Sequence, residues 1–501
     1  MTALPSNTES SCTPLDLAGQ FVLCKDKGAV PEGWPVRQCG EWRLGSHPSL
    51  PVIDVVASDG VAIGWLLGWA IGREGALASG KVQFPLSSDA VDAGERFESS
   101  LYEYGGRFAA VCLAGPRPRF YLDACGSLAA VYCKQQQIVA STPALVPASG
   151  DEDPELVRAV MVPGFDCWYP FGLTPRRGVA RLLPDHFLDL RTWECVRHWP
   201  AGEIAVERDT QSAVREFAEL VKRNIRAVAQ LGPFHACLTG GRDSRMMLAC
   251  SREVLKDCKL FTIAMPTESG TTDRQITRKM ARRFHLDHVL LPLAVPTAQE
   301  EQRFAYRVGQ CVGGLISPML GSFQRLDPQR PVLWGQAGEL GRGFHWRSGD
   351  TESSPVSDAD VVQHLSRLLH PLHHQEVLAR AGQWLASLPV SSALAKWGLL
   401  YQEQYNGCYQ GPLMYGNAHN VFGMWPLCHR RAIEIMLALP ADYRRRLAFE
   451  EDVIASQWPE LLAYPFNWPM GVRKCAFYVG RRVRSMWNRM FPRGRGRSSA
   501  A

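Results

Sequence analysis

The chain has 501 residues, 46% of them hydrophobic, which is enough to bury the cores of two or more domains. Its 15 cysteines are scattered and include no Cys-x-x-Cys pair, which argues against a disulfide framework and against a zinc ribbon. The net charge is +6, but residues 471–501 hold nine Lys or Arg residues and no acid, so the rest of the chain carries −3. The basic excess belongs to this tail, and we expect no nucleic-acid surface on the body.

The first residues lack a basic region followed by an apolar segment, so we expect no secretory signal and a cytoplasmic protein. The apolar run 61–72 is shorter than the roughly 20 residues that a membrane helix needs, and it contains three glycines. We predict a buried strand there.

Residues 1–150 predict a β-rich layered domain, because they contain short apolar runs separated by Gly, Pro and Asp. These runs are 52–57, 61–71, 106–115, 119–124, 128–133 and 137–142. Between 178 and 199, two apolar runs flank Pro184-Asp185, which is typical of a hairpin. We therefore expect residues 151–205 to be a connecting hairpin segment.

From residue 206 the pattern becomes helical, beginning at 212–230, where apolar residues recur every three or four positions. Strands are predicted at 234–238, 259–265 and 287–293, with a helix at 272–284. This alternation predicts a parallel sheet covered by helices, which binds its ligand beyond the carboxyl ends of the strands. The second domain spans 206–470, and the basic tail is 471–501.

The turn LTGGRDSR, residues 238–245, follows the first of these strands. Gly240 and Gly241 let the backbone approach a ligand closely, so that consecutive amide N–H groups can face one concavity. The helix that follows adds its positive end, and Thr239 and Ser244 add hydroxyl groups. Such a turn suits phosphate or pyrophosphate.

Two charged side chains in the turn extend this interpretation. Asp243 is placed to hold a divalent cation against the phosphates, and Arg245 to neutralise their remaining charge. The turn has neither the Gly-Lys-Ser/Thr ending of a Walker A loop nor the G-x-G-x-x-G of a dinucleotide fold. It therefore predicts a phosphate loop of another kind.

The turn resembles the pyrophosphate loop, Ser-Gly-Gly-x-Asp-Ser, of the asparagine synthetase family and of the N-type ATP pyrophosphatases, with Thr239 at the first serine. Asp273 and His288 occur about where that family has an Asp and a His. Residues 104–133 resemble the paired strands of a class II glutamine amidotransferase domain. Residues 417–440 resemble the synthetase segment around its Pro-Phe-Leu-Asp turn. The resemblance covers about residues 50 to 475.

The resemblance implies an α+β fold for residues 1–150, a class II amidotransferase-like β-sandwich. It implies an α/β parallel-sheet ATP pyrophosphatase fold for the synthetase domain. ATP and Mg²⁺ are the implied cofactors, with Asp243 as the metal ligand. The implied ATP and pyrophosphate site comprises Leu238, Thr239, Gly240, Gly241, Asp243, Ser244, Arg245, Ile263 (near the adenine) and Gly335.

The implied reaction is amide synthesis. A substrate carboxylate attacks the α-phosphorus of ATP, pyrophosphate stays in the loop, and ammonia or an amine then displaces AMP from the acyl-adenylate. The amides, the cation and Mg²⁺ would stabilise the charge on the departing pyrophosphate. We expect the carboxylate to belong to a small molecule or a peptide.

The chain departs from the family pattern at several positions. It begins Met1-Thr2-Ala3, without the Cys that serves glutamine-hydrolysing members as nucleophile, so we expect no glutaminase activity and a supply of ammonia or an amine from elsewhere. In GQAGEL, residues 335–340, the family has Gly-Glu-Gly-x-Asp-Glu: Gln336 replaces an acid, and Glu339 aligns with the Asp as a catalytic candidate. His429 stands where the family has an Asp. Lys474 is the candidate for the catalytic lysine of the family.

Simpler interpretations remain open for each feature. The two glycines are compatible with a tight connection, Gln336 and Glu339 with a solvated loop, and Asp273 with a helix N-terminus. The histidines within 364–374 lack the constellation of a metal site and are expected at the surface. Apolar residues at helical spacing in 477–491 suit weak contact with an anionic membrane surface, or a terminal helix that docks on the body.

Three functions follow from these patterns. The first is an ATP-dependent amide ligase, and the second is a catalytically inactive nucleotide-binding scaffold with the same fold. The third is a tRNA-modifying pyrophosphatase, against which the lack of Cys pairs and of a basic body both argue. We favour the ligase.

Overall fold

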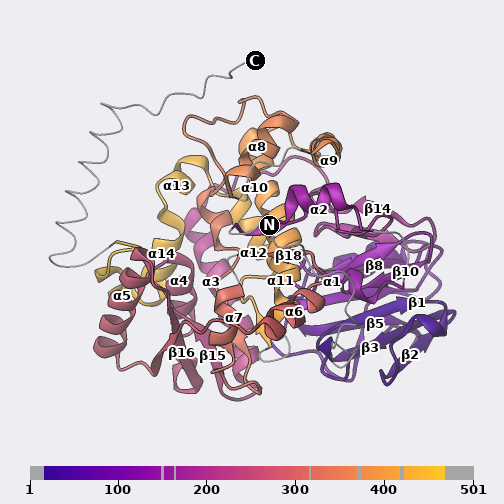
Figure 1. The fold of residues 1–501 in the computed structure, drawn as a ribbon, viewed down its shortest axis with the longest axis horizontal. Helices are drawn as coiled ribbons and strands as arrows, with labels where there is room; N and C mark the ends of the chain where they lie inside the picture. Colours follow the sequence, from indigo (N-terminus) through magenta and orange to yellow (C-terminus); the bar gives the residue numbers. More distant parts are fainter. Residues whose placement is uncertain are drawn as a thin grey trace.

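The computed structural model describes residues 16–147, 152–162, 165–314, 317–368, 374–417 and 422–468. The start Met1-Thr2-Ala3, the candidate Lys474 and the basic tail 471–501 lie outside the described residues. Figure 1 shows the N-terminal strands gathered at one side of the molecule, in indigo and purple, and the later helices at the other.

Two large sheets form the N-terminal part. The six-stranded sheet has the order β12-β9-β10-β1-β3-β2 and is antiparallel throughout. Its strands are β1 (Phe21–Cys24), β2 (Val36–Cys39), β3 (Trp42–Ser46), β9 (Val131–Cys133), β10 (Ile138–Ala140) and β12 (Ala180–Arg181). The seven-stranded sheet has the order β14-β13-β8-β7-β5-β4-β6. Its strands are β4 (Val52–Val56), β5 (Ala62–Ile71), β6 (Lys81–Gln83), β7 (Gly105–Cys112), β8 (Arg119–Leu122), β13 (His186–Asp189) and β14 (Glu194–Arg197).

The two sheets share one hydrophobic core. Phe21 and Leu44 of the first sheet lie in the same buried cluster as Trp65, Val111 and Leu188 of the second. Helix α1 (Ala93–Leu101) contributes to a second cluster, on the other face of the seven-stranded sheet. The strand predicted in the apolar run 61–72 is confirmed as β5, which is almost wholly buried. Burial on both faces explains its continuous apolar sequence.

The hairpin predicted around Pro184-Asp185 is wrong. β12, before this turn, pairs with β9 in the six-stranded sheet, whereas β13, after it, pairs with β8 and β14 in the seven-stranded sheet. The turn therefore carries the chain from one sheet to the other, and the hairpin follows one strand later, between β13 and β14. Both arrangements give two apolar runs around a turn, so the local sequence does not distinguish them.

A five-stranded parallel sheet lies in the C-terminal part, with the order β17-β16-β15-β19-β20. Its strands are β15 (Phe234–Cys237), β16 (Cys258–Ala264), β17 (His288–Pro292), β19 (Val332–Leu333) and β20 (Gly423–Met424). The strands and the helix predicted between 234 and 293 are confirmed, the helix as α5 (Glu268–Phe284). From β15 the chain continues to its neighbours β16 and β17 on one side of the sheet. It then crosses to β19 and β20 on the other side, so the strand order reverses between β15 and β19.

Helices cover this sheet. The long helix α3 (Thr210–Ala229) begins at Asp209, whose side chain accepts a hydrogen bond from the Ser212 amide, and buries one apolar stripe. α5 begins in the same way at Thr267 and ends at His285 in a left-handed conformation. The other helices are α2 (Pro154–Val160), α4 (Arg242–Cys250), α6 (Ala298–Arg307), α7 (Ser317–Phe323), α8 (Asp358–Leu368), α9 (Gln375–Ala386), α10 (Ala393–Leu400), α11 (Gly411–Asn417), α12 (Arg430–Ala438), α13 (Ala441–Arg445) and α14 (Ala448–Gln457).

Between α10 and α11 the chain forms a π-helix, η6 (Tyr401–Gln410), most of which is buried. A short strand pair, β11 (Cys167–Trp168) with β18 (Val312–Gly313), lies apart from the three sheets. The two parts of the chain are joined by direct hydrogen bonds, such as Gly106 N–H to the Cys428 carbonyl at 2.9 Å. None of the described helices combines the length and the apolar character needed to cross a bilayer.

Candidate functional site

The reversal of strand order between β15 and β19 brings two loops together at the carboxyl edge of the parallel sheet. One loop is 238–241, which leads into α4, and the other is 334–337, which leads into the 3₁₀ helix η5 (Gly338–Arg342). A Cβ on Gly335 would lie 3.0 Å from the Asp243 carbonyl carbon, and one on Gly338 would lie 2.2 Å from Asp243 Oδ1. Glycine at both positions therefore allows the loop after β19 and the start of η5 to lie against the first turn of α4.

Side chains already satisfy the loop amides. The Thr239 N–H donates to Ser244 Oγ at 3.0 Å, the Gly240 N–H to Asp273 Oδ1 at 2.8 Å and the Gly241 N–H to Thr239 Oγ1 at 3.0 Å. Helix α4, in contrast, has Gly241 as its N-cap residue, so within the described part of the chain no N-cap side chain bonds to its first amides. The site thus offers an uncapped helix N-terminus and three amides that an incoming anion would have to take from hydroxyl or carboxylate groups.

Arg245 contacts the loop from inside the core and does not present its guanidinium to a bound phosphate as the sequence predicted. It is fully buried, and its guanidinium donates to the carbonyls of Gly240 at 2.9 Å, Tyr464 at 2.6 Å and Pro465 at 2.9 Å. Burial lowers its pKa to about 10. Arg245 therefore ties the loop to the segment around residue 465, and the Asn467 N–H adds a bond to the Gly240 carbonyl at 3.0 Å.

Asp243 forms a bidentate ion pair with Arg342. Its Oδ1 accepts from Nη1 at 2.6 Å and its Oδ2 from Nη2 at 2.9 Å. The same guanidinium lies 2.9 Å from Glu450 Oε1 and 3.2 Å from Glu339 Oε1. Three carboxylates from three elements thus converge on one arginine, and this arrangement fixes the junction of η5, α4 and α14.

A magnesium ion held by Asp243 does not fit this arrangement. Mg²⁺ requires oxygen ligands at about 2.0–2.1 Å in octahedral geometry. Both Asp243 oxygens face Arg342, and the guanidinium lies among the carboxylates that would serve as further ligands. Among the described residues, no group of three or more His, Cys, Asp or Glu side chains is arranged to hold a metal ion.

Glu339 has an environment suited to proton transfer. Burial, together with the nearby charge of Asp243, raises its pKa to about 7, although Arg342 acts in the opposite direction. The Tyr401 hydroxyl donates to Glu339 Oε2 at 2.7 Å from the π-helix η6. A carboxyl that titrates near neutral pH and has a fixed hydrogen-bond partner can serve as a general base.

Sequence reasoning missed Arg342, Tyr401 and Glu450. They lie 99, 62 and 108 residues from their partners Asp243, Glu339 and Arg342, so no local motif connects them. Arg342 alone had a signal, because it stands three residues after Glu339 on the same turn.

Three other candidates lie in or near the loop. Leu238 is fully buried, and its carbonyl accepts from Thr262 Oγ1 at 2.6 Å. His288 Nε2 lies 2.8 Å from the same hydroxyl, and burial lowers the pKa of this histidine to about 4. Its neutral ring therefore reaches the loop only through Thr262. Ile263 is half-buried near the end of β16.

Gln336 lies in the loop after β19, and its buried Oε1 has no hydrogen-bond partner among the residues that the structure describes. His429 lies elsewhere, as the N-cap of α12, where its Nε2 contacts Arg223 Nη2 at 2.7 Å. The structure therefore brings Gln336, and not His429, to the crevice.

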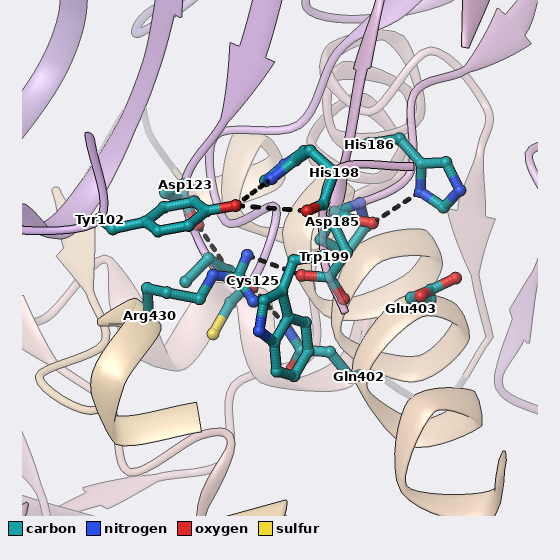
Figure 2. A network of polar contacts seen from close by, with 12 residues as sticks. Tyr102, Asp123, Cys125, Asp185, His186, His198, Trp199, Gln402, Glu403 and Arg430 are labelled. Atoms are coloured by element: carbon teal, nitrogen blue, oxygen red, sulfur yellow. Dashed lines mark hydrogen bonds and ion pairs between the residues drawn. The ribbon is translucent and has the colours of Figure 1, made fainter. Parts of the chain in front are cut away.

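A second polar cluster joins the N-terminal sheets to the π-helix, as Figure 2 shows. Asp185 Oδ1 lies 2.7 Å from Arg430 Nη2, with both side chains almost fully buried. Arg197 is bidentate to Glu403, at 2.5 and 3.1 Å. Burial raises the pKa of Asp185 to about 7, with Arg430 opposing the shift. Because this cluster is enclosed between elements and pairs its charges internally, we assign it to the junction of the two parts.

No protein-family model matches the chain, and no curated protein matches it.

Proposed function

We propose that this protein is an ATP-dependent, AMP-forming amide ligase, as the resemblance to the asparagine synthetase family implies. One observation carries the proposal: a glycine turn with an uncapped helix N-terminus lies in the crevice where the strand order reverses, beside a carboxyl whose pKa is about 7. The first feature suits the phosphates of a nucleotide, and the second suits a base that takes a proton from an amine.

The proposed reaction has two steps. In the first, a carboxylate oxygen of the substrate bonds to the α-phosphorus, the bond from that phosphorus to the bridging oxygen breaks, and pyrophosphate leaves at the loop around Gly240. In the second, an amine or ammonia nitrogen bonds to the acyl carbon, and AMP leaves with the electrons of the C–O bond. Glu339 accepts the proton that the nitrogen loses, while Tyr401 holds its carboxylate.

The proposal names the substrates by chemical class. The proposal takes a small-molecule or peptide carboxylate, with free ammonia or an amine as the second substrate, and it requires no glutaminase step. It includes a cytoplasmic location, where ATP is supplied. Lys474 remains the candidate for the cation that stabilises the adenylation transition state, and a Lys474→Ala variant would test that role.

A catalytically inactive nucleotide-binding protein is the second candidate. The observation that favours it is the internal satisfaction of the loop, because the Gly240 amide is held by Asp273 and both Asp243 oxygens are held by Arg342. A catalytic loop would have to exchange the first of these contacts for a phosphate oxygen.

ATP–pyrophosphate exchange tests the first step. Purified protein with ATP and labelled pyrophosphate is screened against pools of amino acids, uronic acids and small peptides. We expect exchange that depends on one pool and falls at least tenfold in Asp243→Asn, with Glu253→Gln, at an exposed ion pair, as the matched control. Binding of ATP without exchange in any pool would favour the inactive candidate, and no binding of ATP would contradict both.

A further inference from the structure

The cluster around Arg342 combines an excess of negative charge with one fixed cation. Asp243, Glu339 and Glu450 approach the guanidinium to between 2.6 and 3.2 Å, while Glu450 is fully buried and Asp243 is 15% exposed. In a solvated cluster such carboxylates would attract a divalent ion. Here the cation that they hold is part of the chain.

The local backbone positions this arginine. Ala337 adopts a left-handed conformation at φ 73°, Gly343 does so at φ 60°, and the turn of η5 between them presents Arg342 to Asp243. Gly338 lies against the Asp243 carboxylate, where a side chain would collide with it. The Arg444 guanidinium, packed behind η5, donates to the Leu340 carbonyl at 2.6 Å. The position of Arg342 is thus determined by contacts on both sides of the turn.

We propose that Arg342 stands in place of a divalent cation at this loop, so that the loop takes its phosphate-containing ligand without any metal bound to Asp243. The phosphate nature of the ligand rests on the proposed function, but the replacement of the metal does not. A divalent ion placed between Asp243 and Glu339 would lie against the guanidinium, and the repulsion between the two cations excludes it. A Mg²⁺ ion that enters with a nucleotide would have to take its ligands from phosphate and water oxygens, because Asp243 is held by Arg342.

The arrangement also explains why the loop keeps an Asp without a metal. The Arg342 guanidinium forms two parallel bonds with the Asp243 carboxylate, and each terminal nitrogen keeps a second N–H: Nη1 meets Glu450 and Nη2 lies next to Glu339. Removal of its charge would leave three acidic groups close together, which then either bind protons or recruit a cation. Arg342→Met should therefore create the divalent site that the native chain lacks.

Mn²⁺ binding followed by electron paramagnetic resonance tests this directly, without nucleotide. We expect wild type and Asp243→Asn to bind Mn²⁺ equally weakly, within twofold. Arg342→Met should gain a site at least tenfold tighter, and Arg342→Met/Asp243→Asn should lose it again. An Mn²⁺ site in wild type that Asp243→Asn removes would overturn the proposal, and this comparison decides the matter even if Arg342→Met does not fold.

Calorimetric titration with pyrophosphate gives the second readout. In wild type we expect the affinity in EDTA to lie within threefold of that in Mg²⁺. A loss of tenfold or more in EDTA that is absent from Asp243→Asn would overturn the proposal, because it would trace the metal to that side chain. If pyrophosphate binds under neither condition, the proposed function fails, while the Mn²⁺ comparison still judges the role of Arg342.

Discussion

The second proposed step depends on whether the Glu339 carboxyl is ionised. Its pKa of about 7 means that the fraction of carboxylate rises as the pH rises through neutrality. The rate of amide formation should therefore increase up to about tenfold per pH unit below pH 7 and level off above it, and Glu339→Gln should lose about 10²- to 10⁴-fold. The measurement is kcat against pH with the identified substrates.

Tyr401→Phe tests the role of Glu339 without changing Glu339 itself, because it removes the hydroxyl that donates to this carboxylate. The hydroxyl bond lowers the pKa of Glu339, so its loss should move the midpoint of the pH profile to higher pH. If the midpoint of the pH–rate profile in Tyr401→Phe equals that of wild type, or if the wild-type rate does not depend on pH, Glu339 is not the general base.

Asp273 limits the affinity of the loop for anions. Its carboxylate holds the Gly240 amide at 2.8 Å, and burial raises its pKa. Asp273→Asn keeps an oxygen acceptor but removes the negative charge, so pyrophosphate should bind more tightly by about 1 kcal/mol, a factor of about five. Calorimetry would measure this, and weaker binding in Asp273→Asn would instead indicate that the charge supports the bound state.

At the scale of elements, Gly338 determines whether η5 and α4 can meet. A Cβ there would lie 2.2 Å from Asp243 Oδ1, so Gly338→Ala should displace the carboxylate from Arg342 and destabilise the fold by about 1–3 kcal/mol. Gly202→Ala, where a Cβ meets nothing within 4 Å, is the control and should change little. Urea denaturation compares them, and equal stability would contradict this account of the contact.

The π-helix η6 holds the two parts of the chain through a buried charge. Glu403 is fully buried, bonded to Arg197 and to Trp384 Nε1 at 2.7 Å. Glu403→Ala would leave Arg197 without its partner, and we expect a loss of about 3–5 kcal/mol in the free energy of unfolding. Arg226→Ala, which removes an exposed pair with Glu253, should cost at most about 1 kcal/mol. A loss of similar size in both variants would contradict the assignment.

For the whole molecule, the buried pair Asp185–Arg430 links stability to pH. The pKa of Asp185 is about 7 in the fold against 3.8 ordinarily, so between these values the folded state keeps a proton that the unfolded state has lost. The contribution of Asp185 to the free energy of unfolding therefore falls as the pH rises from about 4 to about 7, by at most about 1.4 kcal/mol per pH unit. Asp185→Asn lacks this dependence.

Urea denaturation at pH 5 and pH 8 tests the linkage. Between pH 5 and pH 8, wild type should lose stability relative to Asp185→Asn. If wild type instead gained stability relative to Asp185→Asn between pH 5 and pH 8, the ionised pair with Arg430 would stabilise the fold. The pKa of Asp185 would then lie below its ordinary value.

The sequence by itself determined the local features of this protein. Hydrophobic period and turn residues predict β5, α3, α5 and the strands that flank them, because each depends on neighbours within a few positions. The glycine turn at 238–245 is visible for the same reason.

Only the tertiary structure decided which charges meet. The pairing of Asp243 with Arg342, the orientation of Arg245 into the core and the assignment of β12 and β13 to different sheets all depend on contacts between distant segments. The local sequence around a carboxylate in a turn does not show whether a metal ion or a guanidinium neutralises its charge. The difference arises from the reversal of strand order, which brings the loops after β15 and β19 to one edge of the sheet.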